Sequence, residues 1–337
     1  MKAARLYGPR DLRVEEVPDP SPGPGEVLIK VRACGVCPSD IRAYVGTRVG
    51  TTGLPRTPGH EWAGDVVAVG EGVTTVKVGD RVVADWRVVC GQCHYCRRGI
   101  FNYCTNLQRR VRGGFAEYGV APEANVRVLP PNVTYEMAAF CEPLACCING
   151  NLMTPMSFGD DVVIVGAGPI GLLHLQLAAR RGARLIVSDP IARRLEVAQQ
   201  LGAHDVIDAS QVDPVERVKE LTEGRGADAV IVAVGHPEPI RQALQMAGIA
   251  GRVNLFAGTY PPTEVPLDPN LIHYKQILLT GSHDFTPHHF TTALKLIAYR
   301  IVQVEPLISH RWALDEVQAA FEFTASRAGL KSVVVME

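Results

Sequence analysis

Four of the chain's nine cysteines fall in one polar stretch, which runs from Arg87 to Asn106. Spacings of two residues allow neighbouring thiolates to converge on one tetrahedral zinc ion, and the glycines between them permit the tight turns that this needs. Four sulfur ligands leave no position for water or substrate, so such a site is structural. Free thiols and an iron–sulfur cluster are the alternatives, although the polar surroundings argue against the first and the spacing against the second. The four residues are Cys90, Cys93, Cys96 and Cys104.

A second group of metal-ligand residue types occurs nearer the amino terminus, in the segments ACGVCPSD and TPGHEWAGD. Cys37 offers a thiolate, His60 an imidazole and Glu61 a carboxylate. A catalytic zinc takes these ligand types and keeps one position for water or substrate. Asp40 is a candidate partner that would fix the tautomer of the His60 ring. Each residue alone is more often part of core packing, so the prediction depends on their combination.

A third carboxylate, Glu142, lies in the otherwise apolar segment FCEPLACC. A charge in such surroundings is costly unless it is paired or bound to a metal, so Glu142 is expected to have a partner. Because Pro143 follows, Glu142 could also be a glutamate at the start of a helix with proline in the first turn.

The segment DVVIVGAGPIGLLHLQLAARRGARLIVSD, from Asp161 to Asp189, predicts nucleotide binding. An apolar run typical of a buried parallel strand leads directly into GxGxxG, which opens a helix whose amino terminus faces a pyrophosphate. Asp189 would accept hydrogen bonds from the adenosine ribose and repel a 2′-phosphate, which favours NAD over NADP, although a nearby arginine could accommodate that phosphate. The predicted cofactor-binding residues are Gly166, Gly168, Pro169, Ile170, Gly171, Asp189 and Arg194.

Further apolar runs alternate with helical stretches and predict a doubly wound parallel sheet of six strands, an α/β fold. Beyond the two strands of the nucleotide-binding segment, the runs cover 205–209, 229–234, 253–257 and 276–281. Helical stretches at 193–201 and 239–247 lie between them.

Length and composition limit the remaining possibilities. A chain of 337 residues with 47% hydrophobic and 20% charged residues predicts a folded protein of two domains. A net charge of −1 gives no electrostatic reason to expect nucleic acid or a membrane surface as a partner, so a small-molecule substrate is expected. The first residues contain no apolar signal region, which predicts a cytoplasmic protein. Nine cysteines without such a signal favour metal binding over disulfides.

Taken in this order, the four-cysteine stretch, the Cys37 group and the glycine fingerprint resemble the zinc-containing medium-chain dehydrogenases over essentially the whole chain. The segments GGFAEY and VGDRVV strengthen the resemblance. It implies a mostly β, GroES-like catalytic domain at 1–150 and 285–337 that carries a structural zinc lobe at about 87–106. A Rossmann NAD-binding domain is implied at 151–284. The resemblance also implies one catalytic and one structural zinc ion in each chain and a homo-tetramer or homo-dimer.

Within this family, the Glu142–Pro143 pair resembles the polyol dehydrogenases related to sorbitol dehydrogenase. Other alcohol dehydrogenases have a cysteine ligand in this part of the chain, which makes Cys141 a rival ligand. The resemblance implies a catalytic zinc held by Cys37, His60 and either Glu61 or Glu142, with the other carboxylate holding the zinc-bound water. Ser39 would be the first proton acceptor.

The predicted reaction is the NAD-dependent oxidation of a secondary hydroxyl of a polyol or cyclic polyol to a ketone. Threonine 3-dehydrogenase and simple alcohol dehydrogenase are the enzymatic alternatives, and a non-catalytic dinucleotide-binding protein is a remote one. Two positions depart from the family pattern. Arg42 stands where relatives often have a histidine that ends a proton relay, and Asn149 stands where sorbitol dehydrogenases tend to have histidine.

Overall fold

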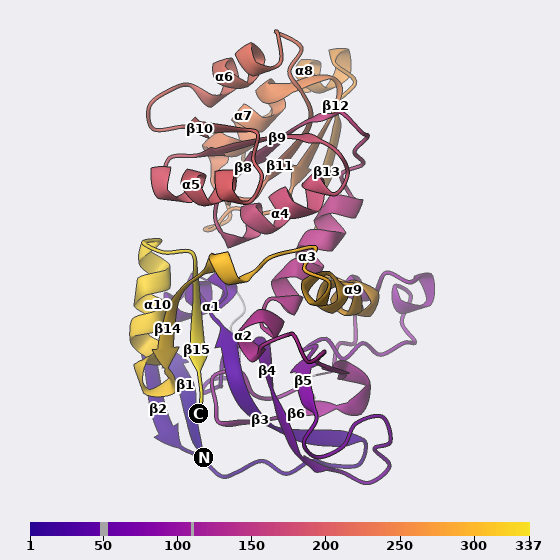
Figure 1. Cartoon of the computed structure of the whole chain (residues 1–337), viewed down its shortest axis with the longest axis vertical. Helices are drawn as coiled ribbons and strands as arrows, with labels where there is room; N and C mark the ends of the chain where they lie inside the picture. Colours follow the sequence, from indigo (N-terminus) through magenta and orange to yellow (C-terminus); the bar gives the residue numbers. More distant parts are fainter. Residues whose placement is uncertain (48–52, 109–110) are drawn as a thin grey trace. The chain divides into compact units, whose positions relative to one another are not determined.

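The computed structural model describes residues 1–47, 53–108 and 111–337, and these form two compact units (Figure 1). The first unit comprises Met1–Ala145 with Phe285–Glu337, and the second comprises Cys146–Asp284. The first crossing lies five residues before the predicted boundary at residue 150, because one continuous helix, α3 (Cys141–Leu152), carries the chain from one unit into the other.

The first unit is built on a mostly antiparallel sheet of seven strands, in the order β14-β15-β3-β4-β5-β7, with β6 also paired to β3. A separate hairpin joins β1 (Lys2–Gly8) to β2 (Asp11–Glu16). The strands of the main sheet are β3 (Glu26–Gly35), β4 (Glu61–Val69), β5 (Arg81–Ala84), β6 (Tyr118–Pro122), β7 (Val126–Val128), β14 (Ile308–Ala313) and β15 (Lys331–Val335). The helices are α1 (Pro38–Tyr44), α2 (Tyr135–Ala138), α9 (Pro287–Ala298) and α10 (Val317–Ser326), with short 3-10 turns η1 (Cys96–Arg98), η2 (Phe101–Tyr103), η3 (Glu123–Asn125), η4 (Glu305–Leu307) and η5 (Leu314–Glu316).

Aromatic side chains form the core of this unit and fix the elements that carry the predicted metal ligands. The Phe321 ring of α10 packs edge-on against Tyr44 of α1, with ring centroids 5.6 Å apart, and against Phe115 at 5.3 Å. Trp62 of β4 is also buried. Burial of these aromatic rings restricts the positions of α1 and β4.

The second unit is a parallel sheet of six strands in the order β10-β9-β8-β11-β12-β13, which is the strand order of a Rossmann fold. Its strands are β8 (Asp161–Val165), β9 (Arg184–Asp189), β10 (Asp205–Asp208), β11 (Ala227–Val232), β12 (Ala247–Leu255) and β13 (Leu278–Gly281). The helices between them are α4 (Pro169–Ala179), α5 (Ala192–Gln200), α6 (Pro214–Leu221), α7 (Pro237–Met246) and α8 (Pro269–Tyr274). Every residue of β8 is buried, as the apolar run predicted for a parallel strand covered on both faces.

The predicted α/β fold of a GroES-like unit and a doubly wound sheet is therefore confirmed, and most element bounds agree within a few residues. The largest difference is at β12, which begins at Ala247 instead of residue 253. The register with β11 shifts between Ala227 and Ala229, so several residues of β12 form a bulge before regular pairing resumes at Arg252. Among the helices of the described residues, all are too short or too polar to cross a membrane.

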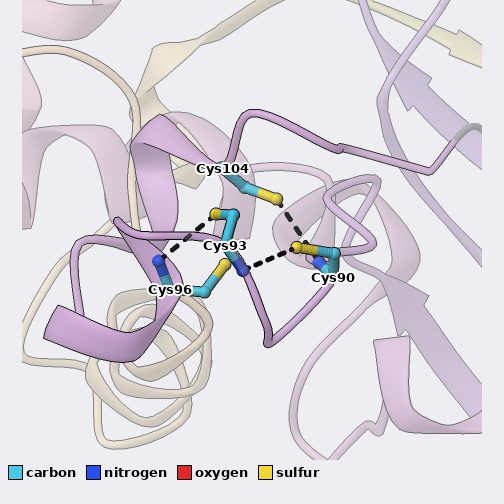
Figure 2. Close-up of side chains that lie close together, drawn as sticks. All are labelled: Cys90, Cys93, Cys96 and Cys104. Carbon is cyan, nitrogen blue, oxygen red and sulfur yellow. Dashed lines mark hydrogen bonds between the residues drawn. The ribbon is translucent and has the colours of Figure 1, made fainter.

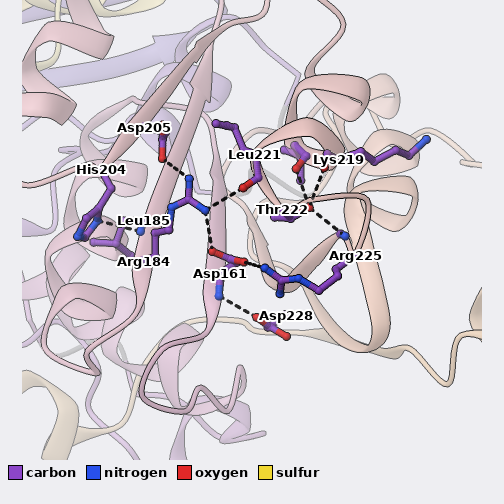
Figure 3. A network of polar contacts seen from close by, with 12 residues as sticks. Asp161, Arg184, Leu185, His204, Asp205, Lys219, Leu221, Thr222, Arg225 and Asp228 are labelled. Atoms are coloured by element: carbon purple, nitrogen blue, oxygen red, sulfur yellow. Dashed lines mark hydrogen bonds and ion pairs between the residues drawn. The ribbon is translucent and has the colours of Figure 1, made fainter.

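A network of ion pairs joins the amino ends of the strands in the second unit (Figure 3). Arg184, at the start of β9, contacts Asp161 of β8 at 3.3 Å and Asp205 of β10 at 2.8 Å. The other carboxylate oxygen of Asp161 contacts Arg225 at 3.3 Å, and the Asp161 amide donates to Asp228. The network holds three neighbouring strands together at their amino ends. A doubly wound sheet binds its ligand at the opposite edge, outside the carboxyl ends of its strands.

Candidate metal and nucleotide sites

The four cysteines of the lobe face one another, with their sulfur atoms all within 4.8 Å (Figure 2). Backbone amides point at these sulfurs: Cys90 N donates to Cys104 Sγ at 3.3 Å, and Cys93 N donates to Cys90 Sγ at 3.4 Å. Backbone N–H groups of Cys96 and Thr105 lower the pKa of Cys93 to about 5. Amides directed at sulfur stabilise thiolates, and four thiolates at this spacing fit a closed zinc site.

Cys37 caps the amino terminus of α1, and this local structure fixes its sulfur. The Ser39 amide and the Ser39 hydroxyl both donate to Cys37 Sγ, at 3.5 and 3.3 Å. Asp40 completes the cap by accepting from the Cys37 amide at 3.2 Å. The cap therefore holds the Cys37 sulfur in a fixed position at the start of α1.

His60 lies directly before β4, between two carboxylates. Its Nδ1 is 3.6 Å from Asp40 Oδ1, and its Nε2 is 3.9 Å from Glu142 Oε1. Burial lowers the pKa of His60, but the charges of Asp40 and Cys37 outweigh burial and raise the pKa well above its ordinary value. A carboxylate on Nδ1 orients the ring and leaves Nε2 for a metal.

Glu142 is in the first turn of α3 and is buried. The indole of Trp86 donates to Glu142 Oε1 at 3.2 Å, so the carboxylate has the partner that its apolar surroundings require. Its neighbour Cys141 is fully buried, and burial raises the pKa of that thiol, which disfavours the thiolate form.

Glu61 is paired with a residue that the sequence did not single out, Lys331 at the start of β15. Burial lowers the pKa of Lys331, but Glu61 and Cys37 more than compensate, and the pKa is raised overall. The pair lies against Gly35 of β3, where a Cβ would collide with the Glu61 carboxylate. Gly35 therefore leaves the space that this ion pair occupies.

The donor set fits zinc. A thiolate from Cys37, an imidazole from His60 and a carboxylate from Glu61 have ligand atoms within 4.8 Å of one another, and Glu142 lies beside the imidazole. One sulfur, one nitrogen and carboxylate oxygens are the ligands of catalytic zinc, whereas a purely structural zinc site is usually richer in cysteine.

The glycine fingerprint lies between β8 and α4, as predicted. Gly166 has a φ of +101°, which a larger residue rarely adopts, and Gly168 caps α4. A Cβ at Gly171 would collide with the Gly166 carbonyl, whereas a Cβ at Gly168 would meet no atom within 4 Å. The chain is therefore tightly packed at Gly171 and open at Gly168, the glycine at which a pyrophosphate approaches the backbone.

Asp189 ends β9 and is buried, and its carboxylate accepts from the amides of Ala167 at 2.8 Å and Ile191 at 2.9 Å. Arg194 of α5 is 4.0 Å from the same carboxylate. The fingerprint, the acidic residue and the arginine thus lie in one place, with Pro169 and Ile170 in the first turn of α4.

The Asn149 side-chain amide is hydrogen-bonded to the backbone, because it donates to the carbonyls of His283 and Asp284 at 3.3 and 2.9 Å.

Sequence reasoning missed Lys331, Trp86 and Gly35. A lysine directly before the apolar run SVVV was a usable signal for Lys331, since a buried strand rarely begins with an unpaired cation.

Residues 23–131 match the family of alcohol dehydrogenase GroES-like domains, and residues 169–299 match the zinc-binding dehydrogenase family. The chain is 38% identical to an L-threonine 3-dehydrogenase of Pyrococcus abyssi, over 99% of this chain and 97% of the relative. It is 35% identical to a sorbitol dehydrogenase of Halalkalibacterium halodurans, over 96% of each. A solved structure described as a zinc-binding dehydrogenase of Sinorhizobium meliloti 1021 bound to NADP has a TM-score of 0.93 and 33% identity, over 99% of each chain. The chain therefore belongs to the zinc-dependent medium-chain dehydrogenases, as a zinc-type alcohol dehydrogenase-like oxidoreductase.

Proposed function

We propose that this enzyme oxidises a secondary hydroxyl of a polyol or cyclic polyol to the ketone, with NAD as the acceptor. One zinc ion is held by Cys37, His60 and Glu142, and a second by the four cysteines of the lobe. The observation that carries the proposal is the position of the buried Glu142, whose Oε1 lies 3.9 Å from His60 Nε2. A carboxylate there, followed by Pro143, is the feature by which the chain resembles the polyol dehydrogenases.

Zinc would supply Lewis acidity toward the substrate hydroxyl, and the nicotinamide would supply the two-electron acceptor. The chain's own residues hold the donors and move the proton. Asp40 keeps His60 Nε2 directed at the metal position, and the cap of α1 keeps the Cys37 sulfur in place. The Ser39 hydroxyl, 3.3 Å from Cys37 Sγ, can rotate to accept the substrate proton and pass it to water. Arg42 cannot act as a base at neutral pH.

Glu142 is the better candidate for the direct ligand, because Glu61 is already paired with Lys331. To bind the metal, Glu61 would have to leave a buried cation uncompensated, which is costly. We assign Glu61 the second role: held by Lys331, its carboxylate would hold a water beside the metal position.

Asp189 supports NAD over NADP. Its carboxylate lies where a ribose 2′-phosphate would meet negative charge, and both oxygens are held by backbone amides, so it cannot easily turn away. Arg194 is the residue that would favour NADP, the cofactor bound to the relative from Sinorhizobium meliloti.

L-Threonine is the second candidate substrate. The relative from Pyrococcus abyssi, at 38% identity, is named an L-threonine 3-dehydrogenase, and threonine also carries a secondary hydroxyl.

The homo-tetramer or homo-dimer stays a prediction, which light scattering of the purified enzyme would check. The cytoplasmic localisation also stays a prediction.

The test is the initial rate of NAD⁺ reduction with linear polyols, inositols, L-threonine and simple alcohols, at one pH and one enzyme concentration. The highest kcat/KM is expected with a polyol or an inositol, and Glu142→Ala should lose most of that activity together with one zinc. Preference for threonine would replace the polyol assignment. Activity with no substrate would overturn the proposal.

A further inference from the structure

The segment Asp85–Arg87 leads from strand β5 into the four-cysteine lobe, and it also reaches the other metal site. Trp86 donates its indole N–H to Glu142 at 3.2 Å, and its ring lies edge-on to His60 with centroids 6.1 Å apart. An N–H bond to a carboxylate restricts where its oxygens can lie, so Trp86 helps to set the position of Glu142 relative to His60.

The next residue, Arg87, contacts the four-cysteine lobe. Arg87 as a whole is 4% exposed, which is unusual for an arginine, and its guanidinium lies 5.0 Å from the centre of the Trp86 ring. Its Nη2 donates to the carbonyl of Asn102 at 2.8 Å. Asn102 belongs to η2, the turn between the third and fourth cysteines of the lobe. The Arg87 guanidinium is thus hydrogen-bonded to the lobe through Nη2 and also packs over the Trp86 ring.

The backbone of this segment is itself held in place. Asn125 donates to the carbonyls of Asp85 and Arg87 at 3.0 and 2.9 Å, and the Arg87 amide donates to the Asp85 carboxylate at 2.8 Å. On the lobe side, Gln108 N donates to the Val88 carbonyl at 2.9 Å. With the backbone fixed, a shift of the lobe acts on the Arg87 side chain and, through stacking, on the Trp86 ring.

We propose that Arg87 and Trp86 are positioning residues that couple the lobe to Glu142, so that metal in the lobe strengthens metal binding at the Cys37–His60–Glu142 site. The inference rests on the proposed assignment of Glu142 as a ligand. A closed metal site of four cysteines then does more than stabilise a loop: it fixes the Asn102 carbonyl that holds Arg87. Coupling of this kind is reciprocal, so metal at the Cys37–His60–Glu142 site also strengthens metal binding in the lobe.

The experiment measures zinc release from the holoenzyme to a coloured chelator, with Cys37→Ser identifying the phase that belongs to the Cys37–His60–Glu142 site. Trp86→Phe removes the indole donor and keeps a ring. Arg87→Lys keeps the charge and loses the planar fork and the stacking. The matched control is Arg81→Lys, because Arg81 also lies over an aromatic ring, that of Tyr135 at 4.7 Å, in the same unit. Circular dichroism of each variant checks that the fold is retained.

Trp86→Phe and Arg87→Lys should each accelerate release from the Glu142 site by roughly 10- to 100-fold, the range for lost partners of metal ligands. Arg81→Lys should leave that rate unchanged. Adding Arg87→Lys to Trp86→Phe should cause little further acceleration at that site, because Arg87 acts through Trp86.

Two results would overturn the coupling. The first is that Arg87→Lys accelerates zinc release from the lobe but not from the Cys37–His60–Glu142 site. The second is that the effects of Arg87→Lys and Trp86→Phe on release from the Cys37–His60–Glu142 site are fully additive. Glu142→Ala separates this inference from the proposed function. If Glu142→Ala accelerates release and Arg87→Lys does not, only the coupling is wrong. If Glu142→Ala leaves release unchanged, Glu142 is not a ligand and the proposed metal site is wrong, together with the coupling.

Discussion

Lys331 and Glu61 form an ion pair in which the side chains are only 5% and 1% exposed. The two residues lie far apart in the sequence, on strands β15 and β4, and both face Gly35 of β3. A buried pair of this kind contributes little net stability compared with apolar packing, but removing one partner is costly because the other charge stays buried. The pair therefore holds the carboxylate next to His60 in one place.

Replacing Lys331 by Met should lower the free energy of unfolding by about 3–5 kcal/mol, because Glu61 then remains as a buried carboxylate without its cation. The double variant with Glu61→Gln should recover much of the loss. Urea unfolding at pH 7.5 measures both. Lys219→Met is the control, because its pair with Glu216 is exposed and contributes at most about 0.5 kcal/mol. Equal effects of Lys331→Met and Lys219→Met would contradict the buried-pair argument.

Gly35→Ala should displace the Glu61 carboxylate, since the added methyl group occupies the space next to it. We expect a measurable loss of zinc from the Cys37–His60–Glu142 site with the lobe zinc retained, as determined by elemental analysis of the dialysed enzyme. Gly8→Ala is the matched control, because a Cβ at Gly8 would meet no atom within 4 Å. Full zinc content in the Gly35→Ala enzyme would show that the space is not needed.

Asp189→Ser should lower kcat/KM for NAD by about tenfold or more and raise it for NADP. The variant loses the carboxylate that accepts from the ribose, a charged hydrogen bond worth about 1.5–3 kcal/mol, and removes the repulsion of a 2′-phosphate. Adding Arg194→Ala should cancel the gain with NADP, whereas Arg193→Ala should not. An unchanged cofactor preference in Asp189→Ser would disprove the role of the carboxylate.

The burial of His174 predicts that the free energy of unfolding decreases in mild acid. It is fully buried in α4, with Nδ1 2.7 Å from the Asn151 amide, and burial lowers the pKa of His174 to about 3 from 6.5. The unfolded chain therefore takes up a proton before the folded chain does, and stability is lost as the pH falls from 6.5 toward 3. Between pH 7.5 and 5.5 this single group accounts for about 1.4 kcal/mol.

Urea unfolding of the wild type and of His174→Gln at both pH values isolates this contribution, because other groups, including the metal ligands, titrate equally in both proteins. The wild type should lose about 1.4 kcal/mol more than the variant. The same pH response in both proteins would mean that His174 is protonated in the folded state.

The local patterns of the sequence were sufficient for the family, the fold class and most individual elements. The glycine fingerprint, the strand before it and Asp189 were readable because a short segment contains the turn, the helix start and the acidic residue together. The four-cysteine lobe was readable for the same reason: its ligands are at most eight residues apart from their neighbours in the chain.

What sequence reasoning could not supply were partners that lie far apart in the sequence. Trp86 and Glu142 are 56 residues apart, and Lys331 pairs with a glutamate at the other end of the chain. The Lys331–Glu61 contact depends on which strands are neighbours in the sheet, here β15 beside β3 and β3 beside β4.

The sequence by itself thus determined the residue types available for chemistry: a closed set of four thiols, a Cys–His–Glu set and a dinucleotide fingerprint. Only the tertiary structure decided that Glu61 is paired with a lysine and that Glu142 accepts a hydrogen bond from an indole. A buried carboxylate has no contact with solvent, so its partner is the polar group that the fold places next to it.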